Sequence, residues 1–125
     1  CMGWKVSFIS EHNIVETAFF GTMKKSELDD AIKATLEECA FRKVLKILAD
    51  CSGLQGGHSL FDLYEKINIL NDMGLDKNIR EALIMPEEQL QQDKIEFWEL
   101  ALGNKGFTVR AFYSRKDAID WLAGQ

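Results

Sequence analysis

The chain has 125 residues, of which 46% are hydrophobic and 28% are charged, and its formal net charge is -5. A domain of this length buries about two-thirds of the surface that its unfolded chain exposes, so the composition predicts a single globular domain over residues 1–125 and excludes a disordered chain. Proteins that bind nucleic acid or anionic membranes need a basic face. This acidic chain disperses its Lys and Arg residues, so we expect neither kind of partner.

Cysteine content and hydropathy indicate where the protein works. The three cysteines, Cys1, Cys39 and Cys51, are odd in number and have no paired spacing, which disfavours a disulfide framework and favours a reducing cytoplasm. Cys1 precedes Met2, and we exclude it from the fold prediction as a remnant of cloning. No apolar run approaches the ~20 residues that span a bilayer, and no secretory leader is recognised, so we expect a cytoplasmic protein without membrane insertion.

The predicted elements begin with a hairpin and a helix. Alternating apolar residues indicate a strand over 4–8, and turn residues at 11–13 lead to an antiparallel second strand over 14–20 that ends at Gly21. The period then changes to that of a helix opening at Ser26. Its apolar stripe consists of Leu28, Ala31, Ile32, Leu36 and Cys39.

Residues 44–49 are nearly continuous in apolar side chains, which is typical of a central strand covered on both faces. The glycine-containing residues 50–58 predict a loop at the carboxyl end of that strand, where open α/β sheets bind ligands. No Lys or Arg occurs in residues 47–65, so a glycine-rich connection is favoured over an anion site. The residues expected to bind a partner or ligand are Asp50, Ser52, Gly56, Gly57, His58 and Ser59.

The following segment predicts a second helix, a fourth strand and a third helix. The second helix has the apolar stripe Leu60, Leu63, Ile67 and Leu70 and stops at Gly74. Residues 80–85 indicate a short strand, and Pro86 with two following acids favours the first turn of the third helix. Gly103 and Gly106 are expected to end that helix, whose core side is Leu90, Phe97, Trp98, Ala101 and Leu102.

A last strand over 107–113 and a last helix over 114–122 complete the predicted order, β-β-α-β-α-β-α-β-α. Three helices share one predicted capping device, worth roughly 1 kcal/mol each, in which a serine is followed three residues later by an aspartate. The pairs are Ser26 with Asp29, Ser59 with Asp62, and Ser114 with Asp117. We therefore predict an α/β fold with a mixed, mostly parallel sheet of about five strands and four helices.

This pattern resembles the STAS family, the SpoIIAA-like or anti-sigma-factor-antagonist-like domains, in an uncharacterised branch. The resemblance rests on the hairpin, the four helices and the apolar strand that ends in Asp50-Cys51-Ser52-Gly53. Residues 109–122 are also similar to the C-terminal strand and helix of uncharacterised STAS-like proteins. The resemblance implies a non-enzymatic regulatory domain that binds a protein partner.

In this family, a serine of an Asp-Ser-Ser-Gly motif at the start of the second helix is phosphorylated, and this releases the partner. His58-Ser59-Leu60-Phe61 lies opposite that motif, with Leu60 opposite the phosphorylated serine, so the familiar motif is missing. Ser59 is the neighbouring candidate phosphoacceptor, although a capping role already explains it. CRAL-TRIO-like lipid carriers belong to the same fold group, so a carrier of a small apolar or lipid ligand is the alternative function.

No pattern for catalysis, a cofactor or a metal is recognised. A reactive Cys51 would need a positive neighbourhood, and its own is acidic. Asp50 lacks the acidic pair and the lysine that a phosphoaspartate site requires, and we expect it to accept hydrogen bonds in its own turn. Two histidines without ligand spacing do not predict zinc, and hydrolase, Walker and dinucleotide patterns are missing.

Aromatic residues leave two questions open. Trp98, Phe97 and Trp121 have the helical spacing of core residues, but a cavity lined by Leu60, Leu63, Trp98 or Trp121 would favour the carrier. Apolar residues of the predicted edge strands would be partly exposed and would favour a homodimer. These residues are Trp4, Phe19 and Phe20.

Overall fold

The computed structural model describes residues 3–124, so Cys1 lies outside the described residues. The elements follow the predicted order. They are β1 (Trp4–Ile9), β2 (Ile14–Thr22), α1 (Lys25–Arg42), β3 (Lys46–Gly56), α2 (Leu60–Asp72), β4 (Arg80–Ile84), α3 (Gln89–Asn104), β5 (Thr108–Phe112) and α4 (Arg115–Ala123). None of the helices within residues 3–124 combines the length and the apolar character needed to cross a bilayer.

The five strands form one sheet in the order β1-β2-β3-β4-β5. β1 pairs antiparallel with β2, and the other neighbours are parallel. The prediction of an α/β fold with a mixed, mostly parallel sheet is confirmed. β3 is the middle strand, so the prediction of an apolar segment through the centre of the sheet is confirmed for residues 46–49, whereas Val44 and Leu45 precede the strand and Leu45 is 43% exposed. β2 lies second in the sheet and is not an edge strand, contrary to the expectation for Phe19 and Phe20.

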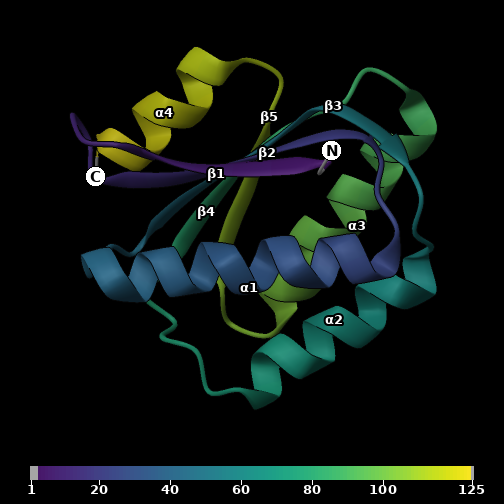
Figure 1. Ribbon diagram of the computed structural model, residues 1–125, viewed down its shortest axis with the longest axis horizontal. Coiled ribbons are helices and arrows are strands. Elements are labelled where there is room, and N and C mark those ends of the chain that lie inside the picture. Colours follow the sequence, from purple (N-terminus) through teal and green to yellow (C-terminus); the bar gives the residue numbers. More distant parts are fainter. Residues whose placement is uncertain (1–2, 125) are drawn as a thin grey trace.

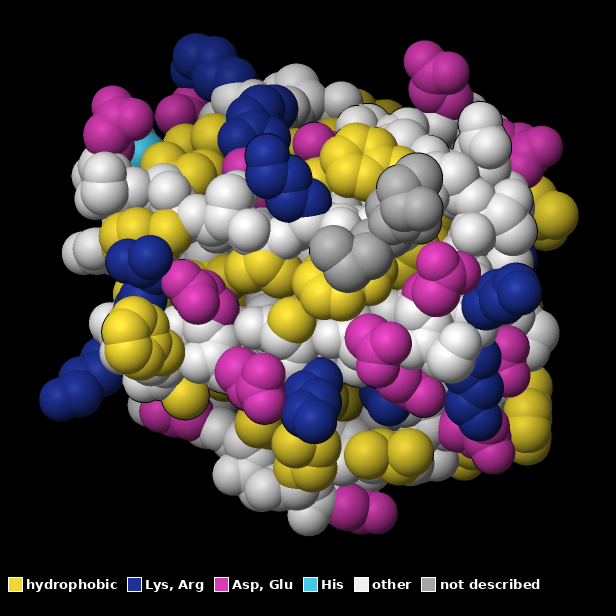
Figure 2. All heavy atoms as spheres, viewed as in Figure 1, with side chains coloured by type: hydrophobic (Ala, Val, Ile, Leu, Met, Phe, Trp, Pro, Cys, Tyr) yellow, Lys and Arg dark blue, Asp and Glu magenta, His cyan; other side chains and the backbone are white. Residues whose placement is uncertain are grey.

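Helices cover the two faces of the sheet unequally, with α4 above the sheet and α1 and α2 below it (Figure 1). Side chains of α1, α2 and α3 meet one sheet face in the larger core, which includes Leu28, Leu63 and Trp98. Ala118 and Leu122 of α4 pack on the other face. The exposed side of α1 carries interspersed acidic and basic side chains (Figure 2). The alternation along each strand thus serves two separate apolar layers.

β3 is longer than predicted, because it continues through residues 50–56 alongside β2. Cys51 and Leu54 remain buried in this extension, and a Cβ on Gly53 would lie 2.9 Å from the carbonyl oxygen of Phe19. The predicted loop over 50–58 is therefore wrong for its first seven residues. Glycine signalled a turn in the sequence, but here it permits close approach of two strands.

Several predicted helix boundaries are also wrong. α1 begins after Lys24, whose backbone N–H donates to Glu27 at 3.0 Å, so Ser26 is not its cap. α3 begins at Gln89 and leaves the buried Pro86 outside, while Gly103 lies within the helix. Two residues of the predicted apolar stripes, Leu60 and Leu90, are exposed.

The two other predicted caps are confirmed. The hydroxyl of Ser59 accepts a hydrogen bond from the Asp62 N–H at 3.1 Å, and the Asp62 carboxylate accepts one from the Ser59 N–H at 3.0 Å. The hydroxyl of Ser114 accepts from the Asp117 N–H at 3.1 Å. These bonds pair backbone N–H groups that have no partner within the helix.

Replacing Ser59 with Ala is expected to lower the free energy of unfolding by about 1 kcal/mol, because the Asp62 N–H loses its acceptor. Ser26→Ala is the matched control, since Ser26 is exposed and does not cap α1; a change below about 0.5 kcal/mol is expected there. Urea denaturation of both variants measures the difference. Equal losses would contradict the capping role of Ser59.

Candidate functional site

The residues predicted to bind a partner lie in two places. Asp50 and Ser52 are in β3, where the Asp50 carboxylate accepts from the Ser52 N–H at 3.0 Å and from its hydroxyl at 2.6 Å. The expected backbone hydrogen bond to Asp50 is confirmed, but it lies within a strand and not in a turn. Gly56 ends the strand, Gly57 and His58 connect it to α2, and Ser59 caps the helix. A binding role for these residues stays a prediction.

Asp50 belongs to an ion cluster that the sequence analysis missed. Arg115, at the start of α4, donates to both carboxylate oxygens of the buried Glu16, at 2.6 and 2.7 Å, and lies 3.6 Å from Asp50. The hydrogen bonds from Arg115 to Glu16 raise the pKa of Arg115. The cluster fastens α4 to β2 and β3. Arg115 and Glu16 are 99 residues apart in sequence, so no local pattern could have revealed the cluster.

The connection between β3 and α2 packs tightly against Met23. The Met23 N–H donates to the Gly56 carbonyl at 2.7 Å, and a Cβ on Gly57 would lie 2.3 Å from the Met23 carbonyl oxygen. His58 is buried, with Nδ1 3.3 Å from that oxygen, and burial lowers its pKa. Of the six predicted residues, Gly56 and His58 are thus inaccessible, whereas Ser52, Gly57 and Ser59 are exposed.

The cysteines are packed as core side chains. Cys51 is buried on the sheet face that α1, α2 and α3 cover, and burial strongly raises the pKa of its thiol. Burial raises the pKa of Cys39 to about 11. Both groups are held as neutral thiols, which are poor nucleophiles. Within residues 3–124, no three His, Cys, Asp or Glu side chains gather in a way that could hold a metal ion.

The exposed start of α2 carries an apolar cluster. Leu60, Phe61 and Tyr64 are 49%, 65% and 53% exposed, although they follow directly after the buried His58. Lys94 of α3 donates to the His58 carbonyl at 2.8 Å, which places α3 beside this cluster. We call Leu60, Phe61 and Tyr64 the α2 apolar cluster. An exposed group of this kind marks an interaction surface more often than an isolated side chain does.

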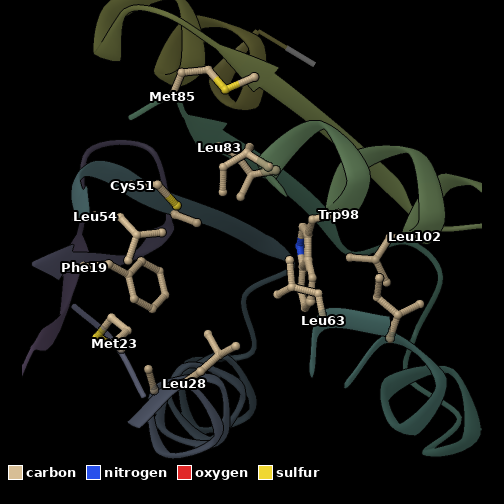
Figure 3. Packing of buried hydrophobic residues seen from close by; sticks show 14 of the residues in the cluster. Phe19, Met23, Leu28, Cys51, Leu54, Leu63, Leu83, Met85, Trp98 and Leu102 are labelled. Atoms are coloured by element: carbon tan, nitrogen blue, oxygen red, sulfur yellow. The ribbon is translucent and has the colours of Figure 1, made fainter. Parts of the chain in front are cut away.

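The interior between the sheet and α1, α2 and α3 contains two cavities, of about 90 Å³ and 60 Å³. The two cavities share five lining residues, which are Phe19, Ile32, Ala49, Glu81 and Trp98. Phe19, Leu28, Leu63 and Trp98 point toward one another from four different elements (Figure 3). Leu63 and Trp98 therefore line a cavity as the carrier alternative required, whereas Leu60 is exposed and Trp121 packs with Phe112 on the opposite face.

Glu81 is the acidic group of this cavity wall. It lies in β4 between Ile47 and Val109 of the neighbouring strands, and its Oε1 accepts from the Trp98 indole N–H at 3.0 Å. Burial raises its pKa from near 4.5 to about 7, although the Trp98 hydrogen bond acts in the opposite direction. The sequence analysis missed it. The available signal was an acid at the same strand parity as the apolar Leu83 and Met85.

No family model matches the chain, and no curated protein matches it. Solved structures do. An uncharacterised protein of the DUF3478 family from Shewanella loihica PV-4, described as having a SpoIIAA-like fold, is 19% identical, with a TM-score of 0.64 over 98% of this chain and 95% of that one. The anti-sigma factor antagonist SpoIIAA, in its unphosphorylated form, is 15% identical, with a TM-score of 0.59 over 98% and 99%. The chain therefore has the SpoIIAA-like fold expected from its sequence.

Gly57→Ala is expected to lower the free energy of unfolding by about 3 kcal/mol or more, because the new Cβ would overlap the Met23 backbone at a φ of +105°. Gly103→Ala is the control. Gly103 lies in α3 with open space around it, so alanine there is expected to stabilise the protein by about 0.5–1 kcal/mol. Thermal or urea denaturation decides between these signs. A neutral Gly57→Ala would contradict the tight packing of the connection.

Glu81→Gln is expected to make stability less dependent on pH. Between pH 4.5 and 7 the unfolded chain releases the Glu81 proton while the folded chain keeps it, so this group lowers stability as pH rises. At pH 8 the variant should be more stable than wild type by on the order of 3 kcal/mol, and at pH 4 nearly equal. Urea denaturation at both pH values measures this, with the exposed Glu37→Gln as control. A variant with the pH dependence of the wild type would rule out a partly buried Glu81 that keeps its proton in the folded chain.

Proposed function

We propose that the chain is a non-enzymatic, cytoplasmic, STAS-like regulatory domain that binds a partner protein through the α2 apolar cluster. The exposure of Leu60, Phe61 and Tyr64 is the observation that carries the proposal. The SpoIIAA-like fold supports it, because the similar SpoIIAA structure is that of an anti-sigma factor antagonist. The neutral, buried thiols of Cys39 and Cys51 support a role other than catalysis.

The core does not use the side chains of the α2 apolar cluster. The inward side of α2 already supplies Leu63, Ile67 and Leu70 to the core. Aromatic side chains such as Phe61 and Tyr64 bury a large area at low entropic cost when a partner covers them, which is why they dominate the energetics of interfaces. A partner that offers an apolar recess would fit this surface.

Ser59 would give the surface a switch. Ser59 is exposed and directly precedes Leu60 and Phe61 in the chain, and its hydroxyl accepts a hydrogen bond from the Asp62 N–H. A phosphate at Ser59 would lie beside the Asp62 carboxylate, so like-charge repulsion would reorganise the start of α2. Ser59 is therefore the candidate phosphoacceptor of the proposal, in place of the familiar motif.

A second copy of the chain is a further candidate partner. Phe20 is exposed on β2, on the sheet face that α4 covers only in part. Sedimentation of the purified protein distinguishes a homodimer from a monomer that binds a different partner.

Phe61→Ser is expected to weaken partner binding roughly 30-fold, the effect of truncating an interface aromatic worth about 2 kcal/mol. Phe41→Ser is the matched control, because Phe41 is 80% exposed and lies far from α2. Lys25, which pairs with α2, is near one end of α1. Phe41 is near the other end, about 24 Å from Lys25 along the helix axis.

The partner is first captured from native lysate by a photo-crosslinker placed at position 61, and its affinity is then measured by calorimetry with purified proteins. Equal affinity of the two variants would reject this surface. Gly57 variants are unsuitable for the purpose, because they disturb the fold itself.

A further inference from the structure

The interior cavities have the dimensions of a site for a small molecule. They measure about 90 Å³ and 60 Å³, and Phe19, Ala49 and Trp98 border both of them. An apolar cavity of roughly 150 Å³ in another protein stays dry and takes up benzene or xenon. Two adjoining cavities with shared walls can merge when a side chain between them changes its rotamer. The space therefore suits a ligand the size of one aromatic ring.

The polar groups of the wall are few and mostly paired. Thr17 and Thr35 hydrogen-bond to each other, and Nδ1 of His58 faces the Met23 carbonyl. None of the described residues that line either cavity is a lysine or an arginine. Glu81 stands apart, because its bond from Trp98 engages Oε1 while the residue borders both cavities. A carboxyl group has acceptor capacity well beyond one hydrogen bond.

From this arrangement we propose that the cavity between the sheet and helices α1–α3 binds a small, uncharged, mostly apolar molecule with one hydrogen-bond donor, which the Glu81 carboxyl group accepts. An apolar ring in the cavity supplies the van der Waals contacts that Phe19, Ile32 and Trp98 lack on the side that faces the empty space. A donor on the ligand gives the partly buried carboxyl group a second hydrogen-bond partner, which offsets the hydration that it loses when the ligand covers it. An anionic ligand is excluded, because its charge would be buried in a wall whose described residues offer no cation to pair with it.

The cavity has a route to the surface between α1 and α2. A surface groove of about 370 Å³ runs between these helices, and it shares Ile32, Leu36 and Leu70 with the larger cavity. Two ion pairs bridge the helices there, an exposed one between Lys25 and Glu65 at 2.9 Å and a partly buried one between Lys66 and Asp29 at 2.6 Å. The exposed pair contributes little stability, so the Lys66–Asp29 pair is the main electrostatic contact that local separation of the helices would break. Apolar side chains are exposed below α1, over α2 (Figure 2).

Three probes of equal ring size test the proposal, namely toluene, phenol and benzoate. Each is titrated into the purified chain while the indole N–H signal of Trp98 is followed by NMR, with the signal assigned through Trp98→Phe. Phenol is expected to bind roughly five- to tenfold more tightly than toluene, the effect of one buried hydrogen bond. Benzoate is expected not to bind. Glu81→Leu should abolish the preference for phenol while toluene still binds.

Filling the cavity tests its location. Ala49→Leu places added carbons in the shared wall and should abolish binding of both phenol and toluene. Ala18→Leu is the matched control on the opposite face of the adjacent strand, and it should leave binding unchanged. If Ala49→Leu does not fold, Ile32→Phe fills the same space from α1.

The results that overturn the proposal are distinct. No response of the folded wild type to millimolar phenol and toluene would mean that the cavity is no ligand site. Benzoate binding as well as phenol would refute the ligand class, and phenol binding no better than toluene would refute the role of Glu81. Because these measurements need no partner protein, they stand or fail independently of the α2 apolar cluster.

Discussion

The pairing of β3 on both of its edges is the constraint on which the rest of the fold depends. Over Ile47–Asp50 the strand bonds to β2 on one side and β4 on the other, and Leu48 and Ala49 between them are buried. After Asp50 only β2 continues, so β3 runs on past the end of β4 to Gly56. This extension carries the chain beyond the end of β4 before α2 begins. α2 then packs against α3, and a space remains between it and the strands.

The sequence was sufficient for the order of elements, because hydrophobic periodicity and serine caps are local signals. It failed where a distant partner decides the outcome. The glycines of residues 50–56 belong to a strand because β2 lies beside them. The error at Ser26 has a local cause, because α1 begins at Lys25 and Ser26 lies inside the helix. Glu81 lies within an apolar run of the sequence, and Trp98, which donates a hydrogen bond to its carboxylate group, is 17 residues away. The Arg115–Glu16 bond crosses almost the whole chain.

Glu81 illustrates how stability and binding make opposite demands on one wall. A carboxyl whose pKa is raised to about 7 by burial destabilises the folded state at neutral pH by on the order of 3 kcal/mol. Domains of this kind are stable by only about 5–15 kcal/mol, so that is a large fraction of the total. The Trp98 hydrogen bond offsets part of the cost and fixes the orientation of the carboxyl group. Packing gives no reason for an acid at this position, whereas recognition of a ligand does.

α2 connects the two proposed surfaces. Leu63 borders the cavity, while Leu60, Phe61 and Tyr64 on adjacent positions of the same turn face outward. A ligand that shifts the backbone at Leu63, and not its rotamer alone, would move the helical turn that carries the α2 apolar cluster. Such movement changes partner affinity only if the partner prefers one position of α2 over the other. The coupling would then be reciprocal, so a partner bound outside would alter the affinity of the cavity inside by the same factor.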